Sequence, residues 1–292
     1  MEEEGVADRL RFHVLRLARE IGERNVFRPA ALHAAEEYIS RCWRQQGHQV
    51  IRQEYTVRGV RSANLEITLR GTSRPDEIIL VGAHYDSVSG SPGANDNGSG
   101  VAALLELSRR LSATPPVRSL RLVAFVNEEP PFFFSGQQGS MQYAKEARQR
   151  GDDIRLMLSL ETMGSFSSAP HSQSYPPLFG FFYPDRADFI AFVANFRSRG
   201  LLSKAVTAFR SASDFPVEQV ATFAFIPGVG WSDHLSFWRY GFRALMVTDT
   251  AFYRYPYYHS ALDTPDRLDY PSLARVTEGL TGMLARLAEV PL

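Results

Sequence analysis

The sequence predicts an α/β fold: a three-layer α/β/α sandwich with a mixed, largely parallel central sheet. The first observation behind this prediction is a set of short runs that are almost entirely apolar, at 78–81, 122–126, 156–160 and 244–247. Runs in which polar residues do not alternate are typical of central strands covered on both faces. The second observation is that helical patterns lie between these runs, and such alternation indicates helices packed on both faces of a sheet.

The N-terminal part of the chain is expected to form two helices followed by two strands. Apolar residues in 6–24 recur at the spacing of one helix face. Pro29 and Gly47 are typical of the first turn and of the residue after the last turn, so a second helix is expected between them. Residues 50–57 and 65–69 alternate apolar and polar side chains, which predicts half-exposed strands at an antiparallel edge.

The rest of the chain is expected to contain more helices and two long loops. Helices are predicted at 99–113, 140–150, 186–198 and 271–289. Segments 165–183 and 208–231 are expected to be loops, and loops of such length in a compact domain usually carry function. No change in composition and no repeat marks a boundary, so residues 1–292 are predicted to form a single catalytic domain.

Charge and hydropathy exclude several classes of partner. The chain has 32 Lys and Arg against 32 Asp and Glu, a balance that argues against a nucleic-acid partner. No run approaches the ~20 apolar residues of a membrane span, so no membrane partner is expected. The first four residues, Met1 to Glu4, are acidic and lack the apolar core of a signal peptide. A cytoplasmic location is therefore expected, or a secreted or periplasmic one if a signal peptide has been removed.

Cys42 is the single cysteine, which excludes a disulfide bond within the chain. It shares a helical pattern with Ile39 and Trp43, and burial is its expected role. The sequence gives no indication of the oligomeric state.

Polar side chains gather where the predicted central strands end. One apolar run leads into His84 and Asp86, the next into Glu128 and Glu129, and the third into Glu161. In open α/β sheets, functional sites form beyond the carboxyl ends of the strands. Segments far apart in sequence are therefore expected to place histidine and carboxylate side chains in one cleft.

His84 and Asp96 are candidate metal ligands, although each segment also has an ordinary structural interpretation. A ligating histidine needs its second ring nitrogen held by an acceptor, and Asp86 is suitably placed to do this. The alternative is a core histidine beside a turn aspartate. Asp96 lies in a segment rich in glycine and asparagine just before a predicted helix, which could be only a turn. A short carboxylate held in such a loop could also bridge two cations.

The pair Glu128–Glu129 is the most informative feature. Two adjacent carboxylates after a buried strand repel one another, and no Lys or Arg lies within several residues on either side. A metal ion would supply the missing positive charge. Adjacent residues at a strand end point in different directions, so one can bind a metal while the other faces a water. The alternative is an exposed acidic turn.

His259 follows two tyrosines, and by itself a histidine in such a segment is more often packed than ligating. His259 is a candidate metal ligand only because the other histidine and carboxylate donors are present. His234, within a Ser-Asp-His segment, is intermediate, and the remaining histidines are assigned no function. A set of histidines and carboxylates suits zinc, with other divalent metals possible. Two metals about 3.5–4 Å apart can polarise a carbonyl and activate water.

The ordered motifs HYDS, GANDNGSG, NEE, LET and YYHSALDT resemble those of the co-catalytic zinc aminopeptidases of peptidase family 28. The likeness extends over about residues 8–289. The resemblance implies a two-zinc exopeptidase that acts on peptides, with a water bridging the two ions. The choice of an aminopeptidase over a carboxypeptidase rests on this resemblance alone.

The resemblance also implies a role for each matching residue. His84 and Glu129 would bind one zinc, Glu161 and His259 would bind the second, and Asp96 would bridge them.

Catalytic and supporting roles follow in the same way. Asp86 would orient His84, and Glu128 would be the general base that takes a proton from the bridging water and passes it to the leaving amine. Tyr258 could donate to the oxyanion, as the equivalent tyrosine does in some relatives. His234 lies in a segment that recurs near the site in the family, and its role is open.

Two departures from the family pattern are visible. Many relatives have Asp where this chain has Glu161, which is one methylene longer and can still ligate. The segment 130–134, Pro-Pro-Phe-Phe-Phe, is unusual and is expected to form part of the cleft wall. Aromatic residues in 165–183 and 252–258 suggest a pocket for an apolar first residue of the substrate.

Two alternatives remain open. Related folds carry out glutaminyl cyclisation with one zinc, and a catalytically silent binding module could share the fold. The silent module is disfavoured because all five ligand positions and Glu128 carry competent residues. A serine hydrolase is disfavoured because the sequence has no G-x-S-x-G elbow, and it has no H-E-x-x-H zinc helix either.

Overall fold

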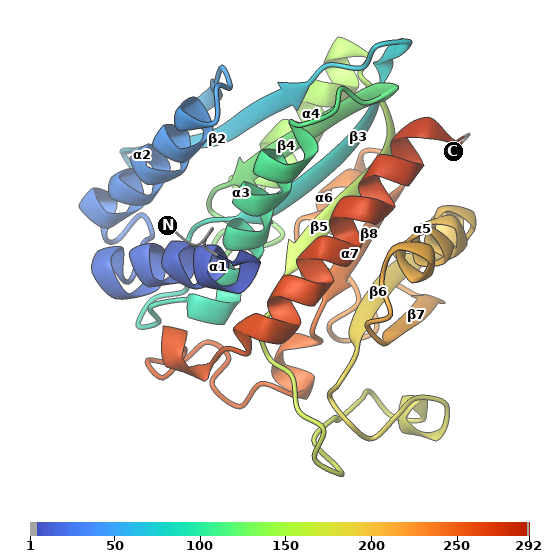
Figure 1. Cartoon of the computed structure of the whole chain (residues 1–292). Coiled ribbons are helices and arrows are strands. Elements are labelled where there is room, and N and C mark those ends of the chain that lie inside the picture. The colour runs from blue at the N-terminus through green and yellow to red at the C-terminus, as the bar shows by residue number, and fades with distance from the viewer. Residues whose placement is uncertain (1–4, 291) are drawn as a thin grey trace.

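The computed structural model describes residues 5–290 and 292, and it has the predicted three layers (Figure 1). The acidic residues 1–4, on which the prediction about a signal peptide rested, lie outside the described part of the chain. All strands form one eight-stranded sheet in the order β1-β2-β4-β3-β5-β8-β6-β7. The strands are β1 (Ile51–Val57), β2 (Val60–Leu69), β3 (Arg74–His84), β4 (Arg118–Phe125), β5 (Asp153–Glu161), β6 (Ile190–Asn195), β7 (Val217–Thr222) and β8 (Ala244–Thr248).

The sheet is mixed, with a parallel centre, as predicted. Strands β4, β3, β5 and β8 run parallel to one another. On one side β2 is antiparallel to β4 and β1 is antiparallel to β2, while on the other side β6 is antiparallel to β8. Strand β7 pairs parallel to β6 and forms the far edge.

Helices cover both faces of this sheet. They are α1 (Val6–Val14), α2 (Pro29–Gln45), α3 (Gly100–Leu111), α4 (Gly139–Arg150), α5 (Arg199–Ala212), α6 (His234–Arg239) and α7 (Tyr270–Glu289). Helices α1, α2, α3, α5 and α7 share one hydrophobic core with the sheet, and α4 and α6 share a second core on the opposite face. Figure 1 shows α3 and α7 lying across the front of the central strands.

Burial on both faces explains why the central strands lack alternation. In β3, Ile79 and Val81 belong to the core beneath α3 and α7, whereas Ile78 and Leu80 belong to the core beneath α4 and α6. Every position of the run is therefore buried, and each such side chain contributes about 1.5–3 kcal/mol of hydrophobic stabilisation. Cys42 is buried as expected, and beside it Trp43 donates a hydrogen bond to Ser108.

The prediction of a helix at 186–198 is wrong. Residues Ile190–Asn195 form β6, and the helix begins only at Arg199. Ile190 and Phe192 face one core while Ala191 and Val193 face another cluster, so this short apolar run is a strand buried on both faces. Apolar runs of this length do not distinguish a strand from a helix by periodicity.

The prediction of one long loop at 208–231 is wrong in part. Helix α5 continues to Ala212, and the edge strand β7 follows. This strand was missed because it lies at the edge of the sheet and carries the polar residues Glu218 and Gln219. The first predicted helix is formed by α1 and a wider π-helical continuation, Leu15–Ile21. In the described residues, no helix combines the length and the apolar content required to cross a bilayer.

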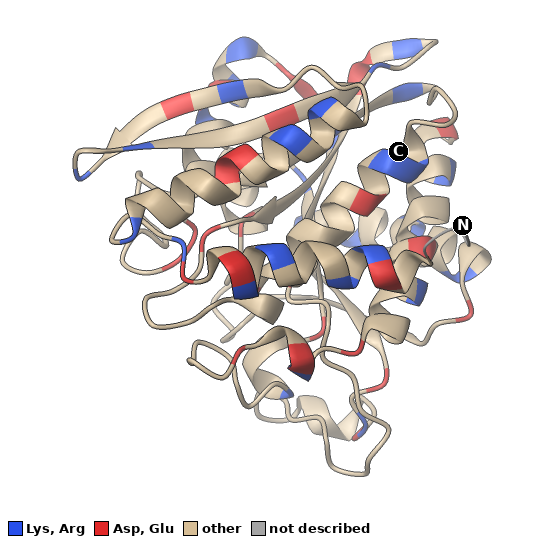
Figure 2. Ribbon diagram, turned by 60° about the vertical axis from the view of Figure 1, so that its left-hand side comes forward, with Lys and Arg blue, Asp and Glu red and all other residues tan. Residues whose placement is uncertain are grey.

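Charged residues of both signs are interspersed along the helices (Figure 2). One buried carboxylate forms ion pairs that join α1 to α3. The carboxylate of Glu106 is 1% exposed and accepts hydrogen bonds of 2.8–3.0 Å from Arg9 and Arg109. Burial raises the pKa of Glu106, but the hydrogen bonds from Arg109 and Arg9 outweigh burial and lower it to about 2.

We expect Glu106 to stabilise the fold in a pH-dependent manner. Because its pKa is lower in the folded chain than in the unfolded one, its contribution is present above pH 4.5 and is lost as the pH falls through about 2. Glu106→Gln should therefore lower the free energy of unfolding by about 3 kcal/mol at pH 7, and by less than half of that at pH 3. Urea unfolding at both pH values measures this, with Glu278→Gln as an exposed control. An equal loss at both pH values would contradict it.

Candidate metal centre

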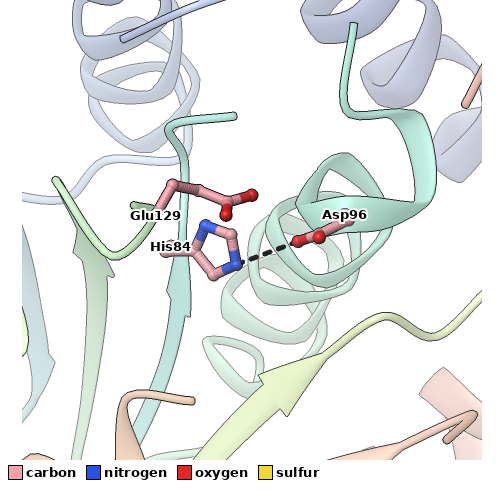
Figure 3. A group of neighbouring side chains, drawn as sticks. All are labelled: His84, Asp96 and Glu129. Carbon is pink, nitrogen blue, oxygen red and sulfur yellow. Dashed lines mark ion pairs between the residues drawn. The ribbon is translucent and has the colours of Figure 1, made fainter. Parts of the chain in front are cut away.

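The predicted donors converge at the carboxyl end of the central strands. His84 ends β3, Glu161 ends β5, and Glu128–Glu129 follow β4. Asp96 comes from the loop before α3, and His259 comes from the segment between β8 and α7. Figure 3 shows His84 and Asp96 pointing toward each other, with Glu129 beside them. Ligand atoms of these three residues all lie within 4.8 Å of one another.

Asp96 lies at the centre of the cluster. Its Oδ1 is 3.2 Å from His84 Nε2, and its Oδ2 is 3.1 Å from His259 Nε2. Each oxygen of one carboxylate therefore faces a different histidine. This is the geometry required of a carboxylate that bridges two cations.

The remaining carboxylates divide between the two histidines. Glu161 Oε2 is 3.5 Å from His84 Nε2, and Glu129 Oε2 is 3.2 Å from His259 Nε2. These distances favour the opposite partition to the one implied by resemblance, which grouped Glu129 with His84 and Glu161 with His259. The sequence could not decide this, because the pairing depends on how three loops fold over the sheet edge. Glu128 is 3.9 Å from His84 Nε2.

Burial and repulsion dominate the electrostatics of the cluster. Burial, together with neighbouring carboxylates, raises the pKa of Glu129 to about 7 and that of Glu128 well above its usual value. Burial alone would lower the pKa of His84, but the charges of Glu161 and Glu128 raise it well above its usual value. His259 is partly exposed, and the nearby carboxylates of Asp96 (3.1 Å) and Glu129 (3.2 Å) outweigh its burial and raise its pKa to about 10. Four buried carboxylates, Asp96, Glu128, Glu129 and Glu161, thus share two histidines, so their charges are only partly balanced.

The donors fit a divalent metal. His84 Nε2 and both carboxylate oxygens of Asp96 are buried, and no described residue makes a well-formed hydrogen bond to any of them. Buried polar atoms of native proteins are normally satisfied, so an unpaired group of this kind calls for a ligand. The set of imidazole nitrogens and carboxylate oxygens, without a thiolate, suits zinc and similar borderline metals.

Asp86 stabilises the backbone of the glutamate pair. Its Oδ1 accepts a hydrogen bond of 3.1 Å from the N–H of Glu128, and its Oδ2 accepts one of 3.1 Å from the N–H of Glu129. Its main-chain oxygen lies 3.3 Å from His84 Nδ1, closer than its carboxylate at 3.6 Å. The main chain of Asp86 therefore lies closer to His84 than the carboxylate that the prediction invoked, and this carboxylate has another task that the sequence did not indicate.

Asp263 stabilises the backbone of the loop that carries Asp96, and the sequence analysis did not identify this residue. Its two oxygens accept hydrogen bonds from the N–H groups of Asn95 (2.8 Å) and Asp96 (3.1 Å). Tyr255 donates a third hydrogen bond to the same carboxylate. The signal was the aspartate four residues after His259, inside the motif that was already singled out.

The loop that carries Asp96 is attached to the end of β5 by its polar side chains. Asn97 donates to the main-chain oxygen of Leu160 (2.8 Å), and Ser99 accepts from the N–H of Met163 (2.9 Å). Asn95 accepts from the N–H of Gly164 (2.8 Å). The asparagines and the serine of this motif therefore fix where Asp96 lies relative to Glu161.

Arg24 is a second residue that sequence reasoning missed. It is fully buried, and its guanidinium donates to the main-chain oxygens of Tyr85 (2.6 Å), Pro92 (2.5 Å) and Gly93 (2.8 Å). Burial lowers the pKa of Arg24 to about 10, opposed by the charges of Asp263, Asp86, Asp96 and Glu129. It is a fixed cation behind the cluster, some 60 positions away from His84 in sequence.

Ser232 and Tyr258 contact the cluster, whereas His234 does not. Ser232 donates a hydrogen bond of 2.7 Å to Glu161. The ring of Tyr258 stacks on His259 with centroids 3.9 Å apart, and burial among Asp96, Glu161 and Glu129 raises the pKa of its hydroxyl well above the usual value. His234 is buried, its Nε2 is 2.8 Å from the oxygen of Val229, and in the described residues no hydrogen bond or ion pair joins it to the metal-binding candidates. Its contacts are those of a packing residue.

A cavity opens beside the cluster. Glu161 and Tyr258 line one end of it, and eight of its 23 lining residues are aromatic. The aromatic segments near 175–183 and 252–258 both contribute to this wall, as the sequence suggested. The segment 130–134 does not line it, contrary to expectation: Phe132 is buried in the core and Phe134 is exposed, with Arg239 over its ring.

Comparison with known sequences gives a consistent result. A model of peptidase family M28 matches residues 64–283. The Escherichia coli protein YfbL is 40% identical over 262 residues, which cover 87% of this chain and 80% of that protein. The Saccharomyces cerevisiae protein YDR415C, described as a probable aminopeptidase, is 26% identical over 238 residues, 76% of this chain and 56% of that protein.

Solved structures show the same fold. A zinc aminopeptidase from Bacillus subtilis matches with a TM-score of 0.76 at 15% identity, covering 98% of this chain and 96% of that one. A glutaminyl cyclase from Fimbriiglobus ruber matches with a TM-score of 0.68 at 20% identity, covering 96% and 94%. At these identities the two structures establish the shared fold alone.

We expect added zinc to stabilise the protein by relieving the repulsion among these carboxylates. At a free zinc concentration of 100 times the dissociation constant, the free energy of unfolding should rise by about 2.7 kcal/mol. Thermal unfolding with and without zinc measures this, and Asp96→Asn should lose most of the gain. Glu278→Gln, which removes an exposed carboxylate on α7, should keep it. A zinc effect of equal size in Asp96→Asn would rule out this centre.

Proposed function

The chain belongs to peptidase family M28, and from this premise we propose that it is a two-metal aminopeptidase that removes the first residue of a peptide. The observation that carries this proposal is the position of Asp96, whose two oxygens face two different histidines at 3.2 and 3.1 Å. Each histidine has a carboxylate of its own beside it, Glu161 or Glu129. The chain thus offers two similar half-sites that share one bridging group.

Two metal ions are assigned to these half-sites. His84, Glu161 and Asp96 would hold one, and His259, Glu129 and Asp96 would hold the other. Zinc fits the donors, and other divalent metals that accept imidazole and carboxylate also fit. Such ions, when bound, polarise the scissile carbonyl and lower the pKa of a water molecule to near neutrality.

Glu128 is proposed as the general base. Its main-chain N–H is fixed by Asp86, and its carboxylate lies 3.9 Å from His84 Nε2, farther than the Asp96 and Glu161 carboxylates. Burial raises its pKa well above the usual value, which makes it a stronger base than an exposed glutamate. It would take a proton from the attacking water and deliver that proton to the leaving amine.

Tyr258 is proposed to stabilise the developing oxyanion. Its ring is stacked on His259, and it lines the cavity at the end that contains Glu161. Burial raises the pKa of its hydroxyl, so the group stays protonated and can donate a hydrogen bond. The cavity next to it would receive the side chain of the first substrate residue.

A single-zinc glutaminyl cyclase is the second candidate, because the F. ruber cyclase has the same fold. It would use one half-site and release ammonia without consuming water. The distances around His259 and Glu129 are as short as those around His84, which supports two half-sites. An N-terminal glutamine peptide assayed beside leucine amide, with zinc counted, separates the two activities.

Glu128→Gln should retain zinc and fold but lose turnover of an amino-acid amide. General-base catalysis contributes typically 10²–10⁴-fold, so kcat should fall by about that factor with little change in KM. Steady-state kinetics of the zinc-loaded protein, together with its metal content, measure this. Glu54→Gln, on the exposed edge strand β1, is the control that should keep full activity. A near-normal kcat in Glu128→Gln would show that another group is the base.

Metal content should also distinguish the ligands. Asp96→Ala should weaken both ions, because it removes the shared carboxylate, whereas His84→Ala and His259→Ala should each weaken one. Equilibrium dialysis followed by elemental analysis counts the zinc per chain. One zinc per wild-type chain at saturation, or loss of a single ion in Asp96→Ala, would argue against the two half-sites.

A further inference from the structure

The cavity beside the metal centre ends in an acidic residue. Glu161 lines it at the metal end, and Glu218 lines it on the outermost strand, β7. Its floor is a row of residues in register across four strands: Glu161 pairs with Thr248, Thr248 with Ala191, and Ala191 with Glu218. All four residues line the same cavity. Strands β6 and β7, which extend the sheet beyond β8, therefore place the carboxylate of Glu218 at the end of the cavity opposite the metal centre.

The register fixes the length of this cavity. Neighbouring strands lie about 4.8 Å apart, so three steps separate the backbones of Glu161 and Glu218 by about 14 Å. Side chains stand roughly perpendicular to a sheet, so their carboxylates keep a similar separation. An extended lysine side chain reaches about 6 Å from its Cα, and arginine slightly more. When the α-amino group of a substrate lysine or arginine lies at the metal centre, its side chain is long enough to form an ion pair with Glu218. A leucine side chain is too short to reach Glu218.

The walls suit a side chain with an apolar stem and a cationic end. The rings of Tyr175 and Tyr183 stack with centroids 5.8 Å apart, and Phe179 stacks on Tyr183 at 6.2 Å. Both phenols are committed elsewhere, because Tyr183 donates to the oxygen of Gln219 and Tyr175 donates to that of Pro184. The remaining ring surfaces can cover a methylene chain and attract a cation through their faces.

Glu218 itself lacks a counter-ion. It is half-buried, and in the described residues no Lys, Arg or His lies within ion-pair distance of its carboxylate. Arg210 lowers its pKa from a distance and donates its own hydrogen bond to the oxygen of Val217, but burial prevails and raises the pKa of Glu218. Arg254 lies behind Phe189, at 4.5 Å from its ring, and does not line the cavity. A half-buried charge of this kind gains from a cation in front of it.

We propose that this cavity receives a lysine or arginine side chain as the first residue of the substrate, with Glu218 as its counter-ion. The proposal rests on the aminopeptidase function put forward above. It changes the expectation from the sequence, which was an apolar first residue: the aromatic walls are present, but the acid at the far end selects for a positive charge.

Paired substrates test the charge at equal or nearly equal side-chain length, because citrulline matches arginine and norleucine is only one terminal atom shorter than lysine. The zinc-loaded enzyme is assayed on amides of lysine against norleucine, and of arginine against citrulline. We expect kcat/KM to favour the cationic member of each pair by about tenfold. In Glu218→Gln this ratio should fall to near one, and because it compares two substrates, general damage to the site cancels. Asp214→Asn removes a charge four residues earlier, at an exposed position paired with Arg275, and should keep the ratio.

The failure of this inference differs from a failure of the proposed function. If all amides are hydrolysed but the wild-type ratio is near or below one, or if Glu218→Gln leaves it unchanged, the pocket assignment is wrong and the aminopeptidase stands. If no amide is hydrolysed, the aminopeptidase proposal fails, and calorimetric binding of lysinamide against norleucinamide to the same protein decides the pocket. Tighter binding of lysinamide supports the role of Glu218, and equal affinity overturns it.

Discussion

The site depends on one electrostatic constraint: several carboxylates are buried together where the protein itself supplies little positive charge. Asp96, Glu128, Glu129 and Glu161 all lie almost entirely away from solvent, and burial is the largest cause of the raised pKa of each glutamate. Like charges in such an environment repel strongly. Two features of the fold keep them in place, namely the main-chain hydrogen bonds accepted by Asp86 and Asp263 and the fixed cation of Arg24. What remains unbalanced is the charge that the proposed metals would neutralise.

The topology of the sheet connects this constraint to selectivity. Parallel strands β3, β4 and β5 end at the same edge, which is why ligands from distant segments meet there. Beyond β8 the sheet continues through β6 and β7, and the register of these strands forms the floor of the cavity that begins at Glu161. The proposed chemistry and the proposed recognition of the first residue are therefore built on one continuous sheet, at positions related by strand spacing.

The sequence was informative where a single physical cause dominates a segment. Runs that are almost entirely apolar identified β3, β4, β5 and β8, because burial on both faces leaves no room for polar alternation. The polar residues after these runs, His84, the Glu128 pair and Glu161, converge as expected because parallel strands share an edge. The sequence-based prediction of secondary structure failed where two structures fit the same pattern. The run at 190–194 was assigned to a helix because its length fits either structure, and β7 was missed because an edge strand with Glu218 exposes polar residues like a loop.

By itself the sequence determined the sandwich fold, the sheet edge at which the polar side chains meet and which side chains the strand ends bring there, because these follow from hydrophobic pattern and strand polarity. Only the tertiary structure decided which carboxylate lies beside which histidine, that Asp86 and Asp263 hold main-chain N–H groups, that His234 binds Val229, and that Glu218 ends the cavity. Apart from the local contact of His234 with Val229, these facts depend on contacts between residues tens to well over a hundred positions apart, whose distances are set by register and loop packing. No local pattern in the sequence carries that information.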